Sequence, residues 1–182
     1  MLVERTVNRL DIVLNRPGRR NVIDRHLRAE LLDALRLAED DATITEVVIR
    51  GNGPSFSSGT DLDELGETTD VGAAHARGLG QSVGLALHRV ADRVTVELHG
   101  PCFGAGIEVP AFASRIVAQP GTTVGLPALG MGLVPGDGGT ASIRRRIGPW
   151  RTAFMVLSGA TVGLEQALDW GLVDERSTDA AG

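Results

Sequence analysis

Several residue types that carry out common chemistry are absent or rare in this chain of 182 residues. It contains no lysine and no tyrosine, which excludes a lysine Schiff base and a phenolic acid from any mechanism. Its one cysteine, Cys102, excludes an internal disulfide, and no histidine stands near it in a motif that would activate a thiol. We therefore expect Cys102 to be a small buried side chain.

Long apolar runs and excess positive charge are also missing. No apolar run approaches the ~20 residues that cross a bilayer, and the first 14 residues alternate as a strand does, which is unlike a signal peptide. The net charge of −5 disfavours general nucleic-acid binding, and all 18 basic residues are arginine, as GC-rich bacterial genomes favour. The length of 182 residues and the hydrophobic content of 42% predict a single globular domain over residues 1–182. Because neither a membrane span nor a signal peptide is recognised, we expect a cytoplasmic location by default. No metal is expected, because metal-ligand spacing is absent among His26, His75, His88 and His99.

The order of apolar patterns along the chain predicts an α/β fold. Alternation predicts a hairpin over residues 2–14 and strands over 46–50, 94–98, 115–118 and 122–126. Helical periodicity and capping residues predict helices over 24–39, 81–91, 104–114, 138–147, 149–158 and 163–170. In the first of these helices Asp24 is the expected cap, and the apolar side chains fall on one stripe, made of Leu27, Leu31, Leu32, Leu35 and Ala38. Residues 66–80 are rich in glycine and poorly periodic, which is typical of a mobile segment.

One glutamate follows a glycine-rich junction between a strand and a helix. Glu108 ends the run HGPCFGAGIE, in which Gly104 and Gly106 open the helix. A helix that begins through glycines presents unpaired backbone N–H groups and the positive end of its dipole. Such donors beside a carboxylate are suited to holding an oxyanion while the acid moves a proton. The alternative is that Glu108 only complements the helix dipole on a solvated face.

A second glycine-rich junction follows the strand at 46–50. It reads GNGPSFSSGTDLDEL, and its loop exposes backbone N–H groups around Gly59 and Thr60 before Asp61 caps a short helix. Two such junctions can each place one N–H group against a single carbonyl oxygen, which is the geometry of an oxyanion hole. The alternative for this loop taken alone is a plain turn.

Together these segments resemble the enoyl-CoA hydratase/isomerase family, the crotonase superfamily. FSSGTDLDEL is similar to the family's oxyanion loop, and HGPCFGAGIEVPAFASRIVA is similar to its second signature. The opening LDIVLNRPGRRNVID and the stretch from TVGLPALG to GLVDE also fit, so the resemblance covers nearly the whole chain in the same order. It implies a crotonase-like ββα spiral core. Compared with the family pattern, we expect the usual C-terminal helical region to be short or missing, because the given sequence continues for only nine residues after Val173.

The resemblance also implies roles for individual residues. The backbone N–H groups of Thr60 and Ala105 would polarise a thioester carbonyl and stabilise an enolate, with Glu108 as a catalytic acid or base. The substrate would be an acyl-CoA or a thioester on a carrier protein, so that coenzyme A is part of the substrate and no cofactor is needed. The implied assembly is a homotrimer or hexamer. Contacts with the substrate or its coenzyme A portion are implied for Arg19, Arg20, Ser58, Gly59, Asp61, Leu62 and Gly104. The alternative for Arg19 and Arg20 is that they are two solvated arginines in the turn that follows Pro17 and Gly18.

Two positions depart from the family's hydratase pattern. Members read Phe-Gly-x-Pro-Glu where this chain reads VGLPA, so that Ala128 replaces the second glutamate. Asp137, in the run VPGDGG, supplies an acid in a neighbouring loop and would share proton shuttling with Glu108. The alternative is that Asp137 caps the helix that begins at Gly138.

These features predict an acyl-thioester lyase or isomerase. Isomerisation or dehydration is favoured over simple hydration, because Ala128 cannot act as an acid or a base. The second hypothesis is a non-catalytic subunit that binds a thioester or assembles with an active homologue. The acyl group is expected to contact residues 62–85.

Overall fold

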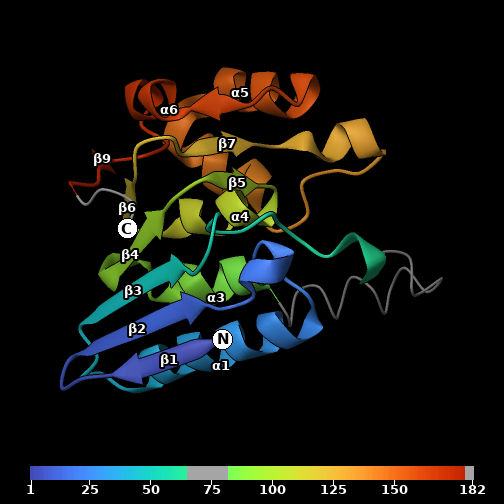
Figure 1. Cartoon of the computed structure of the whole chain (residues 1–182). Helices are drawn as coiled ribbons and strands as arrows, with labels where there is room; N and C mark the ends of the chain where they lie inside the picture. Colours follow the sequence, from blue (N-terminus) through green and yellow to red (C-terminus); the bar gives the residue numbers. More distant parts are fainter. Residues whose placement is uncertain (65–81, 179–182) are drawn as a thin grey trace.

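A six-stranded sheet forms the base of the molecule in the computed structural model, which describes residues 1–64 and 82–178 (Figure 1). The segment 66–80, predicted to be mobile, lies outside the described residues, as does His75. The strand order in the sheet is β1-β2-β3-β4-β6-β9. β1 runs antiparallel to β2, and the other neighbours are parallel. The strands span Leu2–Arg5, Arg9–Leu14, Glu46–Gly51, Val94–Leu98, Arg115–Ala118 and Glu175–Arg176.

A second, three-stranded sheet lies above the first and has the order β5-β7-β8. Its strands span Pro101–Phe103, Thr123–Gly125 and Val162–Gly163. The chain places β4 in the large sheet and β5 in the small one before a helix, and then does the same with β6 and β7. This alternation confirms the predicted ββα spiral. The sequence did not predict β5, β8 or β9, because two or three residues are too few to show an alternating pattern.

The helix α1 (Arg25–Asp40) covers one face of the large sheet with α3 (Val83–Arg89) (Figure 1). Its first turn is capped as predicted, because the Asp24 carboxylate accepts a hydrogen bond of 2.9 Å from the Leu27 amide. The apolar stripe predicted from its 3.6-residue period is the buried face, made of Leu27, Leu31, Leu32, Leu35 and Ala38.

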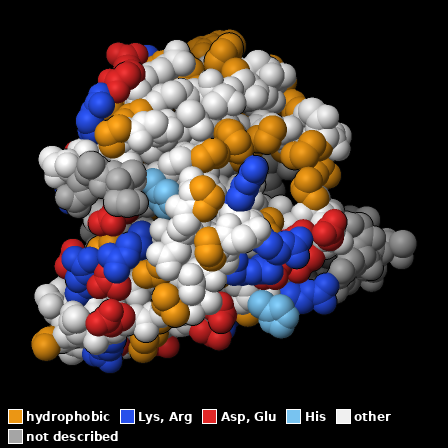
Figure 2. Space-filling model, in the orientation of Figure 1, with side chains coloured by type: hydrophobic (Ala, Val, Ile, Leu, Met, Phe, Trp, Pro, Cys, Tyr) orange, Lys and Arg blue, Asp and Glu red, His pale blue; other side chains and the backbone are white. Residues whose placement is uncertain are grey.

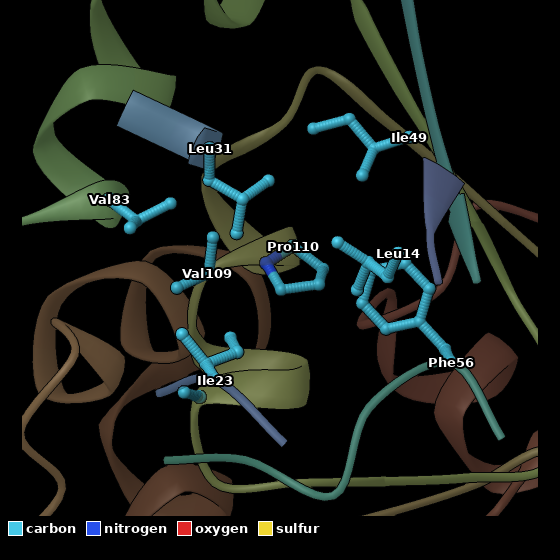
Figure 3. Close-up of a pocket in the computed structure, with 9 residues that line it drawn as sticks. Leu14, Ile23, Leu31, Ile49, Phe56, Val83, Val109 and Pro110 are labelled. Carbon is cyan, nitrogen blue, oxygen red and sulfur yellow. The ribbon is translucent and has the colours of Figure 1, made fainter. Parts of the chain in front are cut away.

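The core contains a small cavity of about 20 Å³ behind α4 (Ala105–Glu108). Figure 3 shows Leu31, Leu14 and Pro110 pointing toward one another across it. A space of this size has room for about one water molecule, but its lining is apolar and offers such a water no partner. We expect it to stay dry.

Two helix predictions need correction or refinement. The single helix expected over 104–114 is wrong: α4 ends at Glu108, and a 3₁₀ turn, η4, spans Pro110–Phe112. Pro110 has no N–H group with which to continue the α-helical hydrogen bonds. The helices expected over 138–147 and 149–158 form α5 (Gly139–Ser158), which is interrupted at Gly148, with φ 78° and ψ 169°. The remaining elements are η1 (Pro17–Arg19), η2 (Leu62–Glu64), η3 (Ala91–Arg93), η5 (Pro127–Met131) and α6 (Leu164–Trp170).

Charge in the run 144–146 is not wholly solvated, although charge runs usually are. The Arg146 side chain is only 11% exposed and forms an ion pair with Asp174 at 3.0 Å. Its guanidinium also donates to the carbonyls of Ala111 and Ala113. Arg146 therefore links α5 to η4 by hydrogen bonds and to the segment that precedes β9 by an ion pair.

Candidate functional site

The two glycine-rich junctions meet at a cavity of about 280 Å³. It is bounded by the loop after β3, the start of α4, η5 and the loop before α5. Figure 2 shows hydrophobic side chains gathered around a hollow in the upper part of the molecule. The apolar side chains that line the cavity include Leu62, Phe103, Met131, Leu133 and Val134.

Asn21 holds the loop after β3 in place. This side chain is fully buried, and its amide nitrogen donates to the carbonyls of Asn52 at 2.9 Å and Ser55 at 3.0 Å. In return, the Ser57 hydroxyl donates to the backbone carbonyl of Asn21 at 2.8 Å. The backbone of Asn21 has φ 51°, a left-handed conformation that asparagine tolerates better than most residues. The sequence indicated only a turn here, because these contacts join residues more than thirty positions apart.

The two junctions approach each other so closely that side chains are excluded. A Cβ atom on Gly106 would lie 2.2 Å from the Ser57 carbonyl oxygen. A Cβ atom on Gly59 would lie 2.7 Å from the Phe103 carbonyl oxygen and 3.5 Å from the Ala105 nitrogen. Gly59 also has φ 99°, which disfavours any other residue. The glycines therefore bring the loop directly against the beginning of α4.

Two backbone N–H groups are left without partners at this meeting point. Thr60 and Ala105 both line the cavity, and neither amide donates a hydrogen bond to a residue that the structure describes. The neighbouring backbone is well fixed, since Ile23 donates to the Gly59 carbonyl at 2.8 Å and accepts from the Asp61 amide at 3.1 Å. Unpaired donors held on a rigid backbone are what an oxyanion hole requires.

Glu108 is buried beside these donors, with 2% of its surface exposed. Its Oε2 accepts hydrogen bonds from the amides of Asp137 at 3.0 Å and Gly139 at 2.9 Å, at the start of α5. The alternative of a solvated glutamate that complements its own helix is therefore wrong. Its Oε1 accepts no hydrogen bond from the described residues, and this atom is not among the fully buried polar atoms that lack a partner. Oε1 is therefore accessible from the cavity. One oxygen is thus anchored and the other is free at the cavity.

Burial changes the acidity of this glutamate. It raises the pKa of Glu108 from 4.5 to about 7. The hydrogen bond from the Gly139 amide lowers this pKa, the nearby charge of Asp137 raises it, and the Asp137 amide lowers it again. A carboxyl with a pKa near neutrality can both accept and donate a proton under ordinary conditions.

Asp137 faces the same cavity from the loop before α5. Its Oδ2 accepts a hydrogen bond of 2.7 Å from the Thr60 hydroxyl. The cap residue of α5 is Gly138, and the Asp137 carboxylate accepts no hydrogen bond from a described backbone amide of this helix. The alternative that Asp137 serves as a helix cap is therefore wrong, while its part in catalysis stays a prediction.

The remaining candidate residues divide into two groups. Asp61, Arg19 and Arg20 do not line the cavity. Asp61 is buried, accepts from the Asp63 amide at 3.2 Å as a cap, and lies 3.6 Å from the Arg19 guanidinium. Arg20 is exposed, and its turn backs onto the loop through a hydrogen bond from Ser58 to its carbonyl. The other group lines the cavity and comprises Ser58, Gly59, Leu62 and Gly104.

Ala128 lies in η5 and contributes to the cavity wall. Among the described lining residues, only Glu108 and Asp137 are ionisable. The structure therefore places a methyl group in the cavity at the position where the resemblance implies a second glutamate. Elsewhere in the described chain, no group of three or more His, Cys, Asp or Glu side chains is arranged to bind a metal, and no helix could cross a bilayer.

A ββα spiral with two unpaired backbone N–H groups beside a buried glutamate defines a protein of the crotonase fold. The chain belongs to the enoyl-CoA hydratase/isomerase family, because the sequence model of that family matches residues 5–180. It is 33% identical to 2,3-dehydroadipyl-CoA hydratase of Escherichia coli (strain K12), over 96% of this chain and 68% of that protein.

Other relatives agree with this family. Enoyl-CoA isomerase/hydratase fer4 of Mycosarcoma maydis is 29% identical over 90% of this chain and 63% of its own length. The crystal structure of enoyl-CoA hydratase from Thermoplasma volcanium GSS1 matches with a TM-score of 0.87 and 28% identity, covering 98% of this chain and 71% of that one. The chain therefore spans about two thirds of the length of these two curated relatives.

Proposed function

We propose that this protein is an acyl-CoA isomerase or lyase that works through an enolate held in the 280 Å³ cavity. The observation that carries the proposal is the buried Glu108, with a free oxygen and a pKa of about 7, in the same cavity as the unpaired amides of Thr60 and Ala105. The amides would stabilise negative charge on the thioester oxygen. Glu108 would move the proton whose loss creates that charge.

Asp137 completes the proton transfer in this proposal. One carboxylate takes a proton from a carbon of the acyl chain, and the electron pair moves toward the thioester oxygen. The other carboxyl group returns a proton at a different carbon, so that the double bond shifts and no atom is lost. In a dehydration, the same acid would instead protonate a departing hydroxyl group.

Ala128 favours these reactions over simple hydration. Syn addition of water uses one group to hold the water and another to move its proton, and each acid or base contributes about 10²–10⁴-fold. The methyl group of Ala128 supplies neither function at its part of the wall. Glu108 and Asp137 favour isomerisation instead, because two carboxyl groups are enough to carry a proton from one carbon to another.

The cavity wall favours an apolar acyl group. Leu62, Phe103, Met131 and Leu133 form much of the described lining, and its ionisable members are both acids. A carboxylate at the far end of the acyl chain would lose hydration against these apolar side chains, and the two acids of the cavity would repel it. We expect uncharged acyl chains to be preferred over ω-carboxylated chains of equal length by at least about tenfold in kcat/KM, which corresponds to ~1.4 kcal/mol.

Product analysis tests the proposed function. Purified protein would be incubated with 2-enoyl, 3-enoyl and 3-hydroxyacyl thioesters, each as the coenzyme A ester and on an acyl carrier protein, and products identified by NMR. Interconversion of 2-enoyl and 3-enoyl esters is the expected result. Glu97→Gln is the matched control, because Glu97 is exposed on β4 away from the cavity and should leave turnover unchanged.

No turnover with any of these thioesters would reject the enzyme and support a non-catalytic subunit. Efficient hydration of 2-enoyl esters without double-bond migration would reject the preference argued from Ala128. The trimeric or hexameric assembly and the cytoplasmic location expected from the sequence stay predictions.

A further inference from the structure

Thr60 brings two different groups to the cavity. Its backbone N–H is one of the two unpaired amides, and its hydroxyl donates a hydrogen bond of 2.7 Å to Oδ2 of Asp137. We propose that the Thr60 hydroxyl is a positioning group that fixes the Asp137 carboxylate for proton transfer. This inference rests on the proposed function, because it assigns Asp137 a proton to carry.

Asp137 has little else to orient its side chain. It lies between Gly136 and Gly138, and the backbone of Gly138 has φ 95°. The described residues form no ion pair with its carboxylate, and the Thr60 hydroxyl is the only described donor to it. Without that hydroxyl, the side chain would be free to leave the orientation seen here. A misplacement of about 1 Å can lower a reaction rate by ~10²-fold.

The hydrogen bond also connects the two carboxylates to the oxyanion donors. Thr60 holds the side chain of Asp137, and the backbone amide of Asp137 holds Oε2 of Glu108 at 3.0 Å. Thr60 would therefore position two groups at once. Its backbone N–H would bind the thioester oxygen, and its hydroxyl would hold the Asp137 carboxylate that carries the proton. This connection gives the hydroxyl a function distinct from the stability of the loop.

The backbone of Thr60 does not depend on its side chain. Ile23 pairs with Thr60 as in a short parallel bridge, through hydrogen bonds to the Gly59 carbonyl and from the Asp61 amide. Valine has nearly the shape of threonine and also favours extended backbone, but it lacks the hydroxyl. Thr60→Val should therefore keep the oxyanion amide in place and remove only the hydrogen bond to Asp137. Thr60→Ser restores a hydroxyl at the same position.

The experiment compares Thr60→Val and Thr60→Ser with the wild type in the isomerisation assay. We expect Thr60→Val to lower kcat by about 10- to 100-fold with KM changed less than about twofold, because the thioester-binding amides remain. Thr60→Ser should recover most of this loss. A Thr60→Val variant with wild-type kcat, or an equal loss in Thr60→Ser, would overturn the proposal.

A double-mutant cycle separates positioning from damage to the fold. If Thr60 acts through Asp137, Thr60→Val should cause no further loss in an Asp137→Asn background. Losses that multiply instead would show that Thr60 acts independently, and would overturn the proposal. Should the wild type turn over no thioester, the proposed function fails separately. A crystal structure of Thr60→Val then decides the positional claim, which an unmoved Asp137 carboxylate would contradict.

Discussion

Replacing Glu108 with glutamine should stabilise the protein most at high pH. The folded protein holds a proton on Glu108 up to about pH 7, whereas the unfolded chain releases it near 4.5. Between these values the folded state binds more protons than the unfolded state, so its stability falls as pH rises. The rise in pKa from 4.5 to about 7 corresponds to ~3 kcal/mol. The contribution of Glu108 to the free energy of unfolding is therefore fully present below pH 4.5, and it is lost as the pH rises through 7.

Glutamine removes this titration and keeps an oxygen for the amides of Asp137 and Gly139. Urea unfolding of both proteins at intervals from pH 4 to pH 8 measures the effect. The free energy of unfolding of Glu108→Gln minus that of the wild type should increase by about 3 kcal/mol across this range. Carboxyl groups that do not interact with Glu108 titrate alike in both proteins and cancel in the difference. A difference that stays constant within about 1 kcal/mol would refute the reasoning from burial.

Three further predictions follow from the cavity and the core. Gly139→Ala should lower turnover by at least about tenfold, because its Cβ would lie 2.5 Å from Cγ of Glu108, while Gly163→Ala, with nothing within 4 Å, should retain full turnover in the same assay. Ala128→Glu should raise the hydration of 2-enoyl esters by about 10²-fold, and an unchanged hydration rate would contradict the argument from the missing acid. Cys102 should resist a thiol reagent in the native protein and react fully in urea, because burial raises the pKa of its thiol to about 12; rapid native labelling would contradict this.

The sequence predicted the parts of the fold that repeat or carry a motif. The α1 stripe and its Asp24 cap follow from local spacing alone, and the two glycine-rich junctions carry the family resemblance. Local patterns could not show that the Glu108 carboxylate binds the start of α5, because its amide partners lie 29 and 31 residues further along the chain. For the same reason, the Thr60–Asp137 hydrogen bond, which joins residues 77 positions apart, was not predicted.

Burial was the second property that the sequence left open. Glycines around Glu108 indicated unpaired amides, but both a solvated and a buried carboxylate fit that pattern. Tertiary packing buries the carboxylate, because Gly139 at the start of α5 lies in contact with the Glu108 side chain and donates a hydrogen bond to it. The role of Asn21 was hidden in the same way, since a buried amide and an exposed turn asparagine look alike in one sequence.

Proton exchange at the α-carbon tests the central claim most directly. A panel of acyl-CoA thioesters would be incubated in D₂O with wild type, Glu108→Gln and the exposed control Glu97→Gln, and deuterium followed by NMR. We predict exchange with the wild type and the control, and a loss of at least about 10²-fold in Glu108→Gln. Equal exchange in wild type and Glu108→Gln, or none with any thioester, would contradict an enolate formed by Glu108 beside the amides of Thr60 and Ala105.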